Sequence, residues 1–351
     1  MCGIAGYIDL NGGHVSLPAL KKMTDALEHR GPDGEGYWIE DNVAIGHRRL
    51  SIIDLSSAGH QPMISHDNRY VLSYNGEVYN FRKLYYELTT LGYVFHSNAD
   101  SEVVLNALIE WGVKAFDFFN GMFSLVLWDR AEQTLLIARD RYGIKPIYYS
   151  HQGGFFAFGS ENKAITALPF FRRVVNKATL MEYFTFQNIF TSSTFLSDVN
   201  ILPPGHYGIL DTKTRNPCLS LFQYWDFNFS EPKEREDDEA YRQQLDSLFH
   251  QAVKRHLVSD VEVGCYLSGG MDSGSITALA AQAEPYIKTF TCGFDLNSAS
   301  GLELAFDERR AAEYMSYLFK TEHYEMVLKA GDMERSFPKL IKHLEDPRLG
   351  Q

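Results

Sequence analysis

The sequence predicts an α+β domain of antiparallel sheet covered by helices, followed by part of an α/β domain with a parallel sheet. Short strand segments joined by turns dominate the first part of the chain, whereas strands and helices alternate after residue 240. A charged stretch lies between the two regions. The 351 residues are about twice a typical domain, so we expect two domains, at 1–210 and 241–351, joined by a linker at 211–240.

The first region alternates apolar segments with turn residues. Val71–Tyr74 runs into Asn75-Gly76, a dipeptide typical of tight turns, so a hairpin tip is expected there. Two further hairpins are predicted, formed by Met122–Trp128 with Thr134–Ala138 and by Ile147–Tyr149 with Phe155–Phe158.

Two amphipathic helices interrupt these strands. One is predicted near Phe81–Leu91 and ends at Gly92, and the other near Ser101–Trp111 ends at Gly112. Both glycines suit a left-handed residue after the last helical turn. Strands in hairpins plus two or more helices indicate antiparallel sheet with a helical cover.

The charged stretch Glu231–Glu239 holds six acidic and two basic residues, and it predicts an exposed linker or helix lead-in. Apolar residues at helical spacing then run from Leu245 to Leu257. Beyond them strands and helices alternate, which predicts parallel strands with crossover helices. The expected strands are Val261–Leu267, Ile287–Cys292 and His323–Val327, and the expected helices are Asp272–Ala283, Asp307–Phe319 and Asp332–Leu344.

Composition excludes several classes of protein. The 45 acidic residues outnumber 33 basic ones, and the net charge of −12 argues against a nucleic-acid partner. No apolar run approaches the roughly 20 residues that span a bilayer, and the N-terminus lacks the features of a secretory signal, so no membrane partner is expected. The 4 cysteines lie far apart, with neither metal-ligand spacing nor a disulfide framework. We therefore expect a cytoplasmic protein.

Cys2 is the first candidate for chemistry. Removal of Met1 would leave Cys2 with a free α-amine, whose pKa of about 7.7–8.0 lets it accept the thiol proton without a histidine. On position alone, a small buried cysteine in a first strand is the plainer interpretation.

The context of Cys2 favours the nucleophile. From an MCGI start, six motifs follow in order, namely GIAG at 3–6, HRGPDG at 29–34, HRRLSI at 47–52, NGEVYN at 75–80, ADSE at 99–102 and ARDRYGIKP at 138–146. Together they resemble the class II glutamine amidotransferase domain, which has an N-terminal-nucleophile sandwich fold of antiparallel sheets between helices. The resemblance covers about the first 210 residues.

The resemblance implies a glutamine site in this domain. Asn75 and the backbone N–H of Gly76 would stabilise the oxyanion formed when Cys2 attacks the glutamine amide. Arg49 would bind the glutamine α-carboxylate, and Asp100 would pair with its ammonium, with Glu77 and Gly76 nearby. The structural alternatives are that Arg49 is a surface arginine, that Asn75 is a turn residue and that Asp100 caps a helix.

A second candidate site is the segment Tyr266–Ser273, which has the sequence YLSGGMDS and joins a predicted strand to a predicted helix. Backbone N–H groups at a helix start bind anions, and Ser268 and Ser273 add hydroxyl donors. The loop lacks GK[ST], so it is not a Walker A motif. A glycine-rich turn without function is the structural alternative.

This loop resembles the pyrophosphate loop of ATP pyrophosphatases, which release pyrophosphate when they transfer AMP. The resemblance implies that ATP binds at Leu267, Ser268, Gly269, Gly270, Asp272, Ser273 and Cys292, and that Asp272 is a ligand of Mg²⁺. Glu345 resembles a glutamate that assists proton transfer near the nucleotide. A carboxylate at a helix C-terminus is the alternative for Glu345.

A glutaminase joined to such a loop resembles the glutamine-hydrolysing asparagine synthetase family. The resemblance implies that ammonia from glutamine displaces AMP from an aspartyl adenylate made from aspartate and ATP. Family members are much longer and carry a further SGxGxDE motif that this sequence lacks. We therefore expect a C-terminally truncated chain, either a fragment or a natural truncation, with a complete glutaminase half and doubtful asparagine synthesis. A homodimer is left open as the oligomeric state.

Other interpretations stay open at this point. The ammonia acceptor could be a sugar or a β-lactam precursor, or the chain could be a glutaminase only. An RNA-modifying enzyme would share the pyrophosphate loop, but it gives no role to MCGI or NGE and predicts a basic face. A non-catalytic partner is the last alternative, and it predicts that Met1 is retained.

Overall fold

The computed structural model describes residues 1–230, 237–295, 297 and 306–345, and its packing divides the chain into two units. The first unit comprises Met1–Asn228 together with Glu345, and the second is Phe229–Leu344. The first unit extends beyond the expected limit at residue 210 because β12 (Leu219–Gln223) pairs with β11 (His206–Asp211). Residues 231–236 of the predicted linker at 211–240 lie outside the described residues. Asp237 caps helix α7 (Asp238–His256), whose first turn takes up the end of the predicted linker.

The first sheet of the first unit places β1 near its centre. Its six strands pair in the order β10-β8-β9-β1-β3-β2, and every pair in it is antiparallel. All seven residues of β1 are buried, which fits a central strand covered on both faces. The strands are β1 (Gly3–Asp9), β2 (Gly34–Glu40), β3 (Val43–Arg49), β8 (Tyr148–Gln152), β9 (Phe155–Gly159) and β10 (Val199–Ile201).

The second sheet also has six strands, in the order β12-β11-β7-β6-β5-β4, and it is antiparallel throughout. The predicted turn at Asn75-Gly76 is wrong, because β5 continues through both residues and pairs them with Ser124 and Phe123 of β6. Nine consecutive pairs between β5 and β6 outweigh the local turn preference of the dipeptide. The remaining strands are β4 (Met63–Ile64), β5 (Tyr70–Val78), β6 (Gly121–Asp129) and β7 (Thr134–Arg139).

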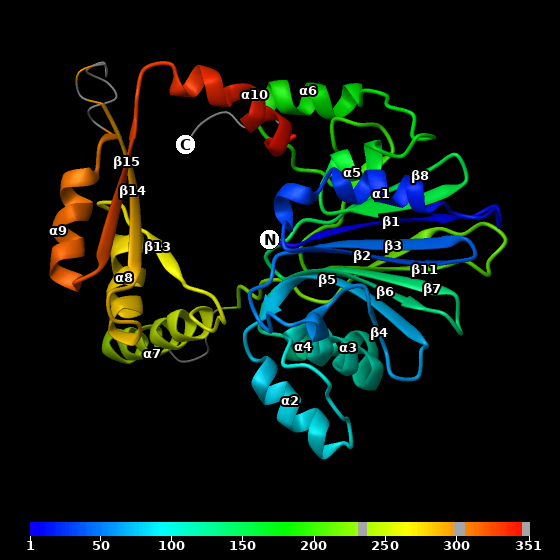
Figure 1. Ribbon diagram of the computed structural model, residues 1–351, viewed down its shortest axis with the longest axis horizontal. Coiled ribbons are helices and arrows are strands. Elements are labelled where there is room, and N and C mark those ends of the chain that lie inside the picture. Colours follow the sequence, from blue (N-terminus) through cyan, green and yellow to red (C-terminus); the bar gives the residue numbers. More distant parts are fainter. Residues whose placement is uncertain (231–236, 296, 298–305, 346–351) are drawn as a thin grey trace. The chain divides into compact units, whose positions relative to one another are not determined.

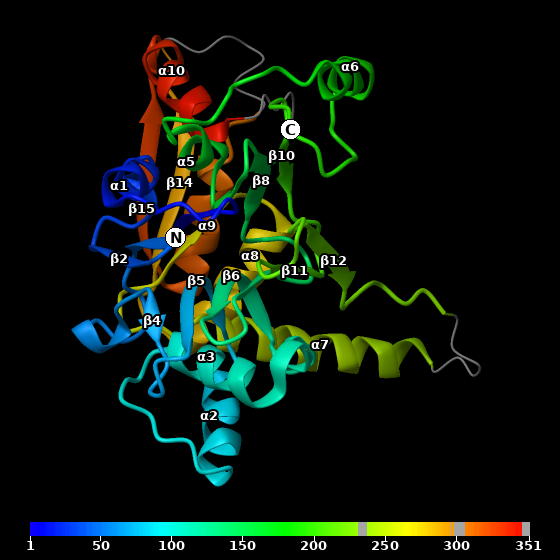
Figure 2. The same ribbon diagram turned by 90° about the vertical axis from the view of Figure 1, so that its right-hand side faces the viewer.

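Helices cover the outer faces of both sheets, as both views of the chain show (Figures 1 and 2). α1 and α5 pack on the first sheet, and α3 packs on the second with α2 beside it. Positive φ angles at Gly92 and Gly112 follow α2 and α3, as predicted. The helices are α1 (Leu17–Asp25), α2 (Phe81–Thr90), α3 (Asp100–Trp111), α4 (Ala115–Phe118), α5 (Asn162–Thr166) and α6 (Lys177–Phe186), with 3₁₀ turns η1 (Glu28–Arg30), η2 (Ser57–Gly59) and η3 (Gly112–Lys114).

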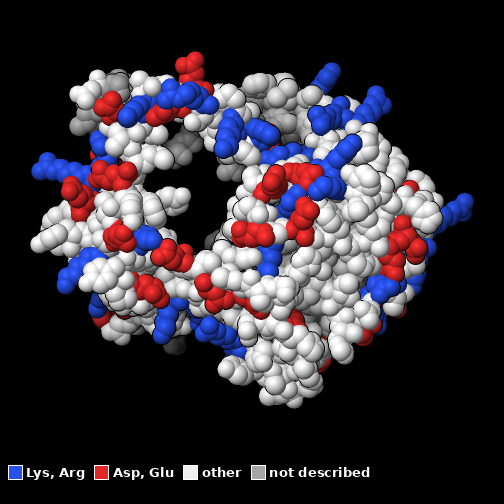
Figure 3. Space-filling model, in the orientation of Figure 1, with Lys and Arg blue, Asp and Glu red and all other residues white. Residues whose placement is uncertain are grey.

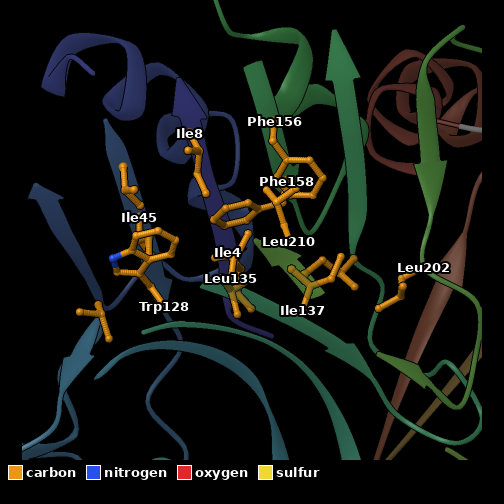
Figure 4. Close-up of a cluster of buried hydrophobic side chains, with 14 residues drawn as sticks. Ile4, Ile8, Ile45, Trp128, Leu135, Ile137, Phe156, Phe158, Leu202 and Leu210 are labelled. Carbon is orange, nitrogen blue, oxygen red and sulfur yellow. The ribbon is translucent and has the colours of Figure 1, made fainter. Parts of the chain in front are cut away.

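The main core lies between the two sheets. Ile4, Ile8 and Ile45 of the first sheet face Trp128 and Ile137 of the second, and all five side chains are buried (Figure 4). A second apolar layer lies between the first sheet and helices α1 and α5. The unit therefore has antiparallel sheets sandwiched between helices, which confirms the predicted fold class.

The second unit contains a parallel sheet with strand order β13-β14-β15. Its three strands and the helices that follow them confirm the predicted alternation. Val253, Ala280 and Ile287 form its small buried core. The elements are α7 (Asp238–His256), β13 (Gly264–Tyr266), α8 (Met271–Ala283), β14 (Lys288–Phe294), α9 (Arg309–Phe319), β15 (Glu322–Leu328) and α10 (Asp332–Leu344).

Two properties of the described residues concern nucleic-acid and membrane partners. Acidic and basic side chains are interspersed on the face shown in Figure 3 rather than gathered in one basic patch among the described residues. Within the same residues, every helix is too short or too polar to cross a bilayer.

The inter-sheet core should carry much of the stability of the first unit. Replacing the fully buried Phe158 with alanine leaves a cavity between the sheets and is expected to lower the free energy of unfolding by about 3–5 kcal/mol. Phe184→Ala is the matched control, because that ring is 70% exposed and its loss should change stability by less than about 0.5 kcal/mol. Urea unfolding of both variants measures the difference, and equal effects would contradict the assigned core.

Candidate active site

A cavity of about 270 Å³ in the first unit is lined by residues from β3, β5, β6 and α3 and by Cys2, which precedes β1. It is smaller than the roughly 300–1,000 Å³ pockets that hold drug-sized ligands, and so suits a single amino acid. The structure brings every residue predicted for the glutaminase site to its wall: Cys2, Arg49, Asn75, Gly76, Glu77 and Asp100.

Cys2 lies immediately before β1, at the edge of the cavity. Its Sγ is 3.3 Å from the backbone N of Leu50, which donates to it, and 3.6 Å from the Leu50 carbonyl oxygen. Burial raises the pKa of the Cys2 thiol, although the hydrogen bond from Leu50 opposes that rise. A thiol in this setting stays protonated at neutral pH and needs a base in order to attack.

Arg49 ends β3, and the loop that follows holds its guanidinium. Nη1 donates to the Ser56 carbonyl at 2.7 Å, and Nη2 donates to the Asp54 carbonyl. Gly59 is needed for this arrangement, because a Cβ there would lie 2.2 Å from Nη2 of Arg49. Since carbonyl oxygens carry no full charge, the guanidinium keeps its positive charge available to the cavity.

Asn75 and Gly76 lie side by side in β5. The Asn75 side chain is only 1% exposed, and its Nδ2 donor has no partner among the described residues. A buried amide without an acceptor is costly, so an acceptor supplied by a ligand would relieve it. At Gly76 a Cβ would lie 2.4 Å from the Met122 carbonyl oxygen, so only glycine permits the close pairing of β5 with β6.

Asp100 begins α3 and is buried. Its Oδ2 accepts hydrogen bonds from the Tyr74 hydroxyl at 2.8 Å and from the Val78 backbone N at 3.1 Å. Burial raises the pKa of Asp100 to about 6, against the lowering effect of both hydrogen bonds. The carboxylate is therefore ionised at neutral pH, but at a free-energy cost.

Tyr74 was not predicted as a site residue, although it immediately precedes the NGE motif. Its backbone N donates to Gln61 Oε1 at 2.6 Å, and its carbonyl oxygen accepts from His47 Nε2 at 3.0 Å. Burial lowers the pKa of His47 to about 3, so this imidazole stays neutral and donates its Nε2 proton. The hydrogen bonds of Tyr74 thus link Asp100 to the buried residues Gln61 and His47.

Lys145 is another cavity residue without a predicted role, although the motif at 138–146 contains it. Burial lowers the pKa of its ammonium, and the negative charge of Glu77 opposes this. Burial also raises the pKa of Glu77, an effect that Lys145 opposes. Glu77 and Lys145 therefore stabilise each other's charged forms in the wall of the cavity.

In the second unit, the predicted pyrophosphate loop joins β13 to α8. The Ser268 hydroxyl contacts that of Ser273 at 2.9 Å and accepts from the Gly270 backbone N at 3.1 Å. Gly269 packs closely on α9, since a Cβ there would lie 2.8 Å from Ala311 Cβ. Gly270 caps α8 without a side-chain hydrogen bond, which suits an anion at the first helical N–H groups.

The remaining residues predicted to bind the nucleotide in this unit are Leu267, Asp272 and Cys292. The backbone N of Leu267 donates to the Phe290 carbonyl at 2.9 Å, and Cys292 lies farther along β14, toward its carboxyl end. Asp272 is exposed in the first turn of α8. One exposed carboxylate suits Mg²⁺ that is also held by phosphates, whereas the described residues contain no cluster of three or more protein metal ligands.

Glu345 belongs to the first unit by its packing. Its carboxylate accepts hydrogen bonds from the backbone N of Asn162 at 2.6 Å and of Lys163 at 2.7 Å, at the start of α5. The role predicted for Glu345 in proton transfer near a nucleotide stays a prediction.

Comparison with known proteins shows relatives along the whole chain. Asparagine synthetase (glutamine-hydrolyzing) 3 of Bacillus subtilis strain 168 is 35% identical over 99% of this chain and 56% of its own length. Asparagine synthetase (glutamine-hydrolyzing) 1 of the same organism is 32% identical over 99% of this chain and 53% of its own length. The chain thus spans about half the length of these two relatives. A Methanocaldococcus jannaschii protein provisionally named asparagine synthetase (glutamine-hydrolyzing) 2 is 31% identical, over 99% of this chain and 68% of its length.

Among solved structures, the glutamine phosphoribosylpyrophosphate amidotransferase from B. subtilis matches 92% of this chain and 65% of its own, with a TM-score of 0.48 and 16% identity. An allosteric regulatory enzyme of purine biosynthesis matches 93% of this chain and 80% of its own, with a TM-score of 0.49 and 15% identity. Residues 1–225 match the glutamine amidotransferase domain family, and residues 244–351 match the asparagine synthase family. The chain therefore belongs to the glutamine-hydrolysing asparagine synthetase family, with an amidotransferase domain as its first part.

Proposed function

We propose that the first unit hydrolyses glutamine to glutamate and ammonia, with Cys2 as the nucleophile. The observation that carries this proposal is that four groups line one cavity of amino-acid size: a thiol, a guanidinium, a buried carboxylate and an amide donor that has no partner among the residues the structure describes. Nucleophilic attack on the side-chain amide of a free amino acid requires these four groups.

The proposed reaction begins after Met1 is removed, when the α-amine of Cys2 becomes free. The amine takes the thiol proton as Sγ forms a bond to the amide carbon of glutamine. The proton then passes to the leaving nitrogen, ammonia departs, and water hydrolyses the thioester to glutamate and the free thiol.

Charge develops on the amide oxygen during this attack. Asn75 Nδ2 would donate a hydrogen bond to it, with the Gly76 backbone N–H as the second donor. The unpartnered state of Nδ2 supports this role, because a donor held in place by a strand needs no reorganisation when the oxyanion forms.

The two ends of the amino-acid backbone would be recognised by opposite charges. Arg49 would bind the α-carboxylate, and Asp100 would bind the α-ammonium with Glu77 close by. The ammonium would also offset the cost of ionising Asp100 in a buried position.

For the second unit we propose ATP binding at the loop from Leu267 to Ser273, with Cys292 nearby. The uncapped start of α8 and its serine hydroxyls support pyrophosphate binding there. Asp272 would hold Mg²⁺, which supplies charge neutralisation to the leaving pyrophosphate. By analogy with the named relatives, aspartate is the proposed ammonia acceptor, asparagine the product, and Glu345 the residue that assists proton transfer.

The nucleophile assignment is tested by glutamate release from glutamine with the purified chain. We expect turnover by the wild type and none detectable for Cys2→Ala, because only the thiol can form the acyl intermediate. Cys218→Ala, which changes an exposed cysteine outside the cavity, should retain full activity. Comparable rates for the wild type and Cys2→Ala would disprove the assignment.

The oxyanion role predicts a specific kinetic signature for Asn75→Ala. The variant loses a donor that acts mainly in the transition state, so kcat should fall by about 10²–10³-fold while KM for glutamine changes little. Steady-state kinetics of glutamate release separate the two parameters. A rise in KM with kcat unchanged would show that Asn75 only binds the substrate.

Asp100→Asn should weaken glutamine binding and yet stabilise the protein. The folded-state pKa of Asp100, about 6, lies above that of the unfolded chain, so its ionisation destabilises the fold above pH 6 and has little effect below pH 4. We expect the variant to be more stable by about 2 kcal/mol at pH 7.5, with the gain shrinking toward pH 4. KM for glutamine should rise roughly 10-fold or more.

Urea unfolding at both pH values and steady-state kinetics check this pair of effects. If Asp100→Asn were less stable than the wild type at pH 7.5, the result would contradict the claim that the buried carboxylate costs stability and is kept for ligand binding.

A further inference from the structure

The hydroxyl of Tyr74 holds the carboxylate of Asp100 in the wall of the cavity. Tyr74 is only 2% exposed, and its hydroxyl donates to Asp100 Oδ2 at 2.8 Å. The Val78 backbone N donates to the same oxygen at 3.1 Å. Neither of these two bonds uses Oδ1, so both leave the second oxygen of the carboxylate to other donors.

Tyr74 keeps its proton and therefore acts as a donor at neutral pH. Burial raises the pKa of its hydroxyl well above the usual value, and the negative charge of Asp100 raises it further. The bond from this hydroxyl favours the ionised form of Asp100, whereas burial disfavours that form. The hydroxyl thus both orients the carboxylate and helps to keep it charged.

Two buried side chains fix the backbone of Tyr74. Gln61 Oε1 accepts from its backbone N at 2.6 Å, and His47 Nε2 donates to its carbonyl oxygen at 3.0 Å. His47 belongs to β3 and lies two residues before Arg49 on that strand. The strand that carries the proposed carboxylate-binding arginine therefore also anchors the tyrosine that holds Asp100.

We propose that Tyr74 is a positioning residue that holds Asp100 at a fixed spacing from Arg49 and thereby makes the cavity selective for α-amino acids. The α-ammonium and the α-carboxylate of an amino acid are attached to one carbon atom, so the groups that bind them must keep one spacing. β3 carries Arg49 directly, and it reaches Asp100 through His47 and Tyr74. The inference rests on the proposed function, in which Asp100 binds the ammonium of glutamine.

Loss of the Tyr74 hydroxyl should weaken recognition of the ammonium and leave the reacting groups in place. The Cys2 thiol is bonded by Leu50, and pairing of β5 with β6 holds Asn75 opposite Ser124. A hydrogen bond to a charged group changes an equilibrium constant by roughly tenfold or more. KM for glutamine should therefore rise while kcat changes little.

Tyr74→Phe tests the proposal, because it removes only the hydroxyl oxygen. Ammonia release is measured from glutamine and from 4-carbamoylbutanoate, which is glutamine without its α-amino group. We expect the variant to lower the preference for glutamine, taken as the ratio of the two kcat/KM values, by about tenfold. KM for glutamine should carry most of this change, with kcat within about threefold of the wild type.

Tyr224→Phe is the matched control. The Tyr224 hydroxyl donates a bond of the same 2.8 Å length to the Arg139 carbonyl oxygen, outside the cavity. The substrate preference of this variant should stay within about twofold of the wild type. An unchanged preference in Tyr74→Phe would overturn the proposal, and that includes an equal loss of kcat/KM on both substrates. Unfolding of Tyr74→Phe, seen by circular dichroism, would also overturn it, since the hydroxyl would then serve the fold.

A binding measurement separates this inference from the reaction on which it rests. Cys2→Ala has no thiol to form the acyl intermediate, so isothermal titration calorimetry of this variant measures binding alone. In that background we expect Tyr74→Phe to weaken glutamine binding about tenfold and to leave binding of 4-carbamoylbutanoate within about twofold.

Equal dissociation constants for glutamine with and without the hydroxyl, or no binding of glutamine, would overturn the role of Tyr74. If the binding difference were present and the wild type released no glutamate, the proposed reaction would be wrong and the role of Tyr74 in recognition would be confirmed.

Discussion

The pairing of β1 between β3 and β9 is the constraint on which the site depends. β1 is buried on both faces, and its first residue, Gly3, directly follows Cys2. A nucleophile attached to a flexible terminus would sample many directions, and ordering it would cost conformational entropy at each turnover. Here the sheet supplies that order when the protein folds. The core between the two sheets, which includes Ile4 and Ile8, would therefore serve the proposed chemistry as well as stability.

The cavity collects groups that would be unfavourable in an ordinary protein interior. Asp100 is ionised in a buried position, and the side-chain donor of Asn75 has no partner within the described part of the chain. Burial shifts the pKa values of Glu77 and Lys145 toward their neutral forms. The proposed substrate, glutamine, would reduce these costs, because it supplies an ammonium, a carboxylate and an amide oxygen. The features that are unfavourable in the protein by itself are therefore the ones that support the proposed ligand.

The sequence predicted those parts of the structure that depend on local pattern or on ordered motifs. Hairpins and helix ends followed from turn residues and glycines, and the six residues at the cavity were found because their motifs occur together in one order. Asn75-Gly76 was misjudged as a turn because pairing with β6 is a tertiary effect that a dipeptide cannot reveal. Tyr74 was missed for a similar reason, since its hydrogen bond to Asp100 joins residues 26 positions apart.

Four consecutive residues of β5, Tyr74 to Glu77, line the cavity. The proposed oxyanion donors and part of the proposed substrate contacts therefore lie on a single stretch of backbone. Alternate side chains of a strand point to opposite faces, so a one-residue insertion or deletion within β5 would exchange those faces. Evolutionary changes of length in this domain should therefore fall in the turns, such as that between β6 and β7. The register of one strand limits how far the proposed enzyme can diverge while it still uses glutamine.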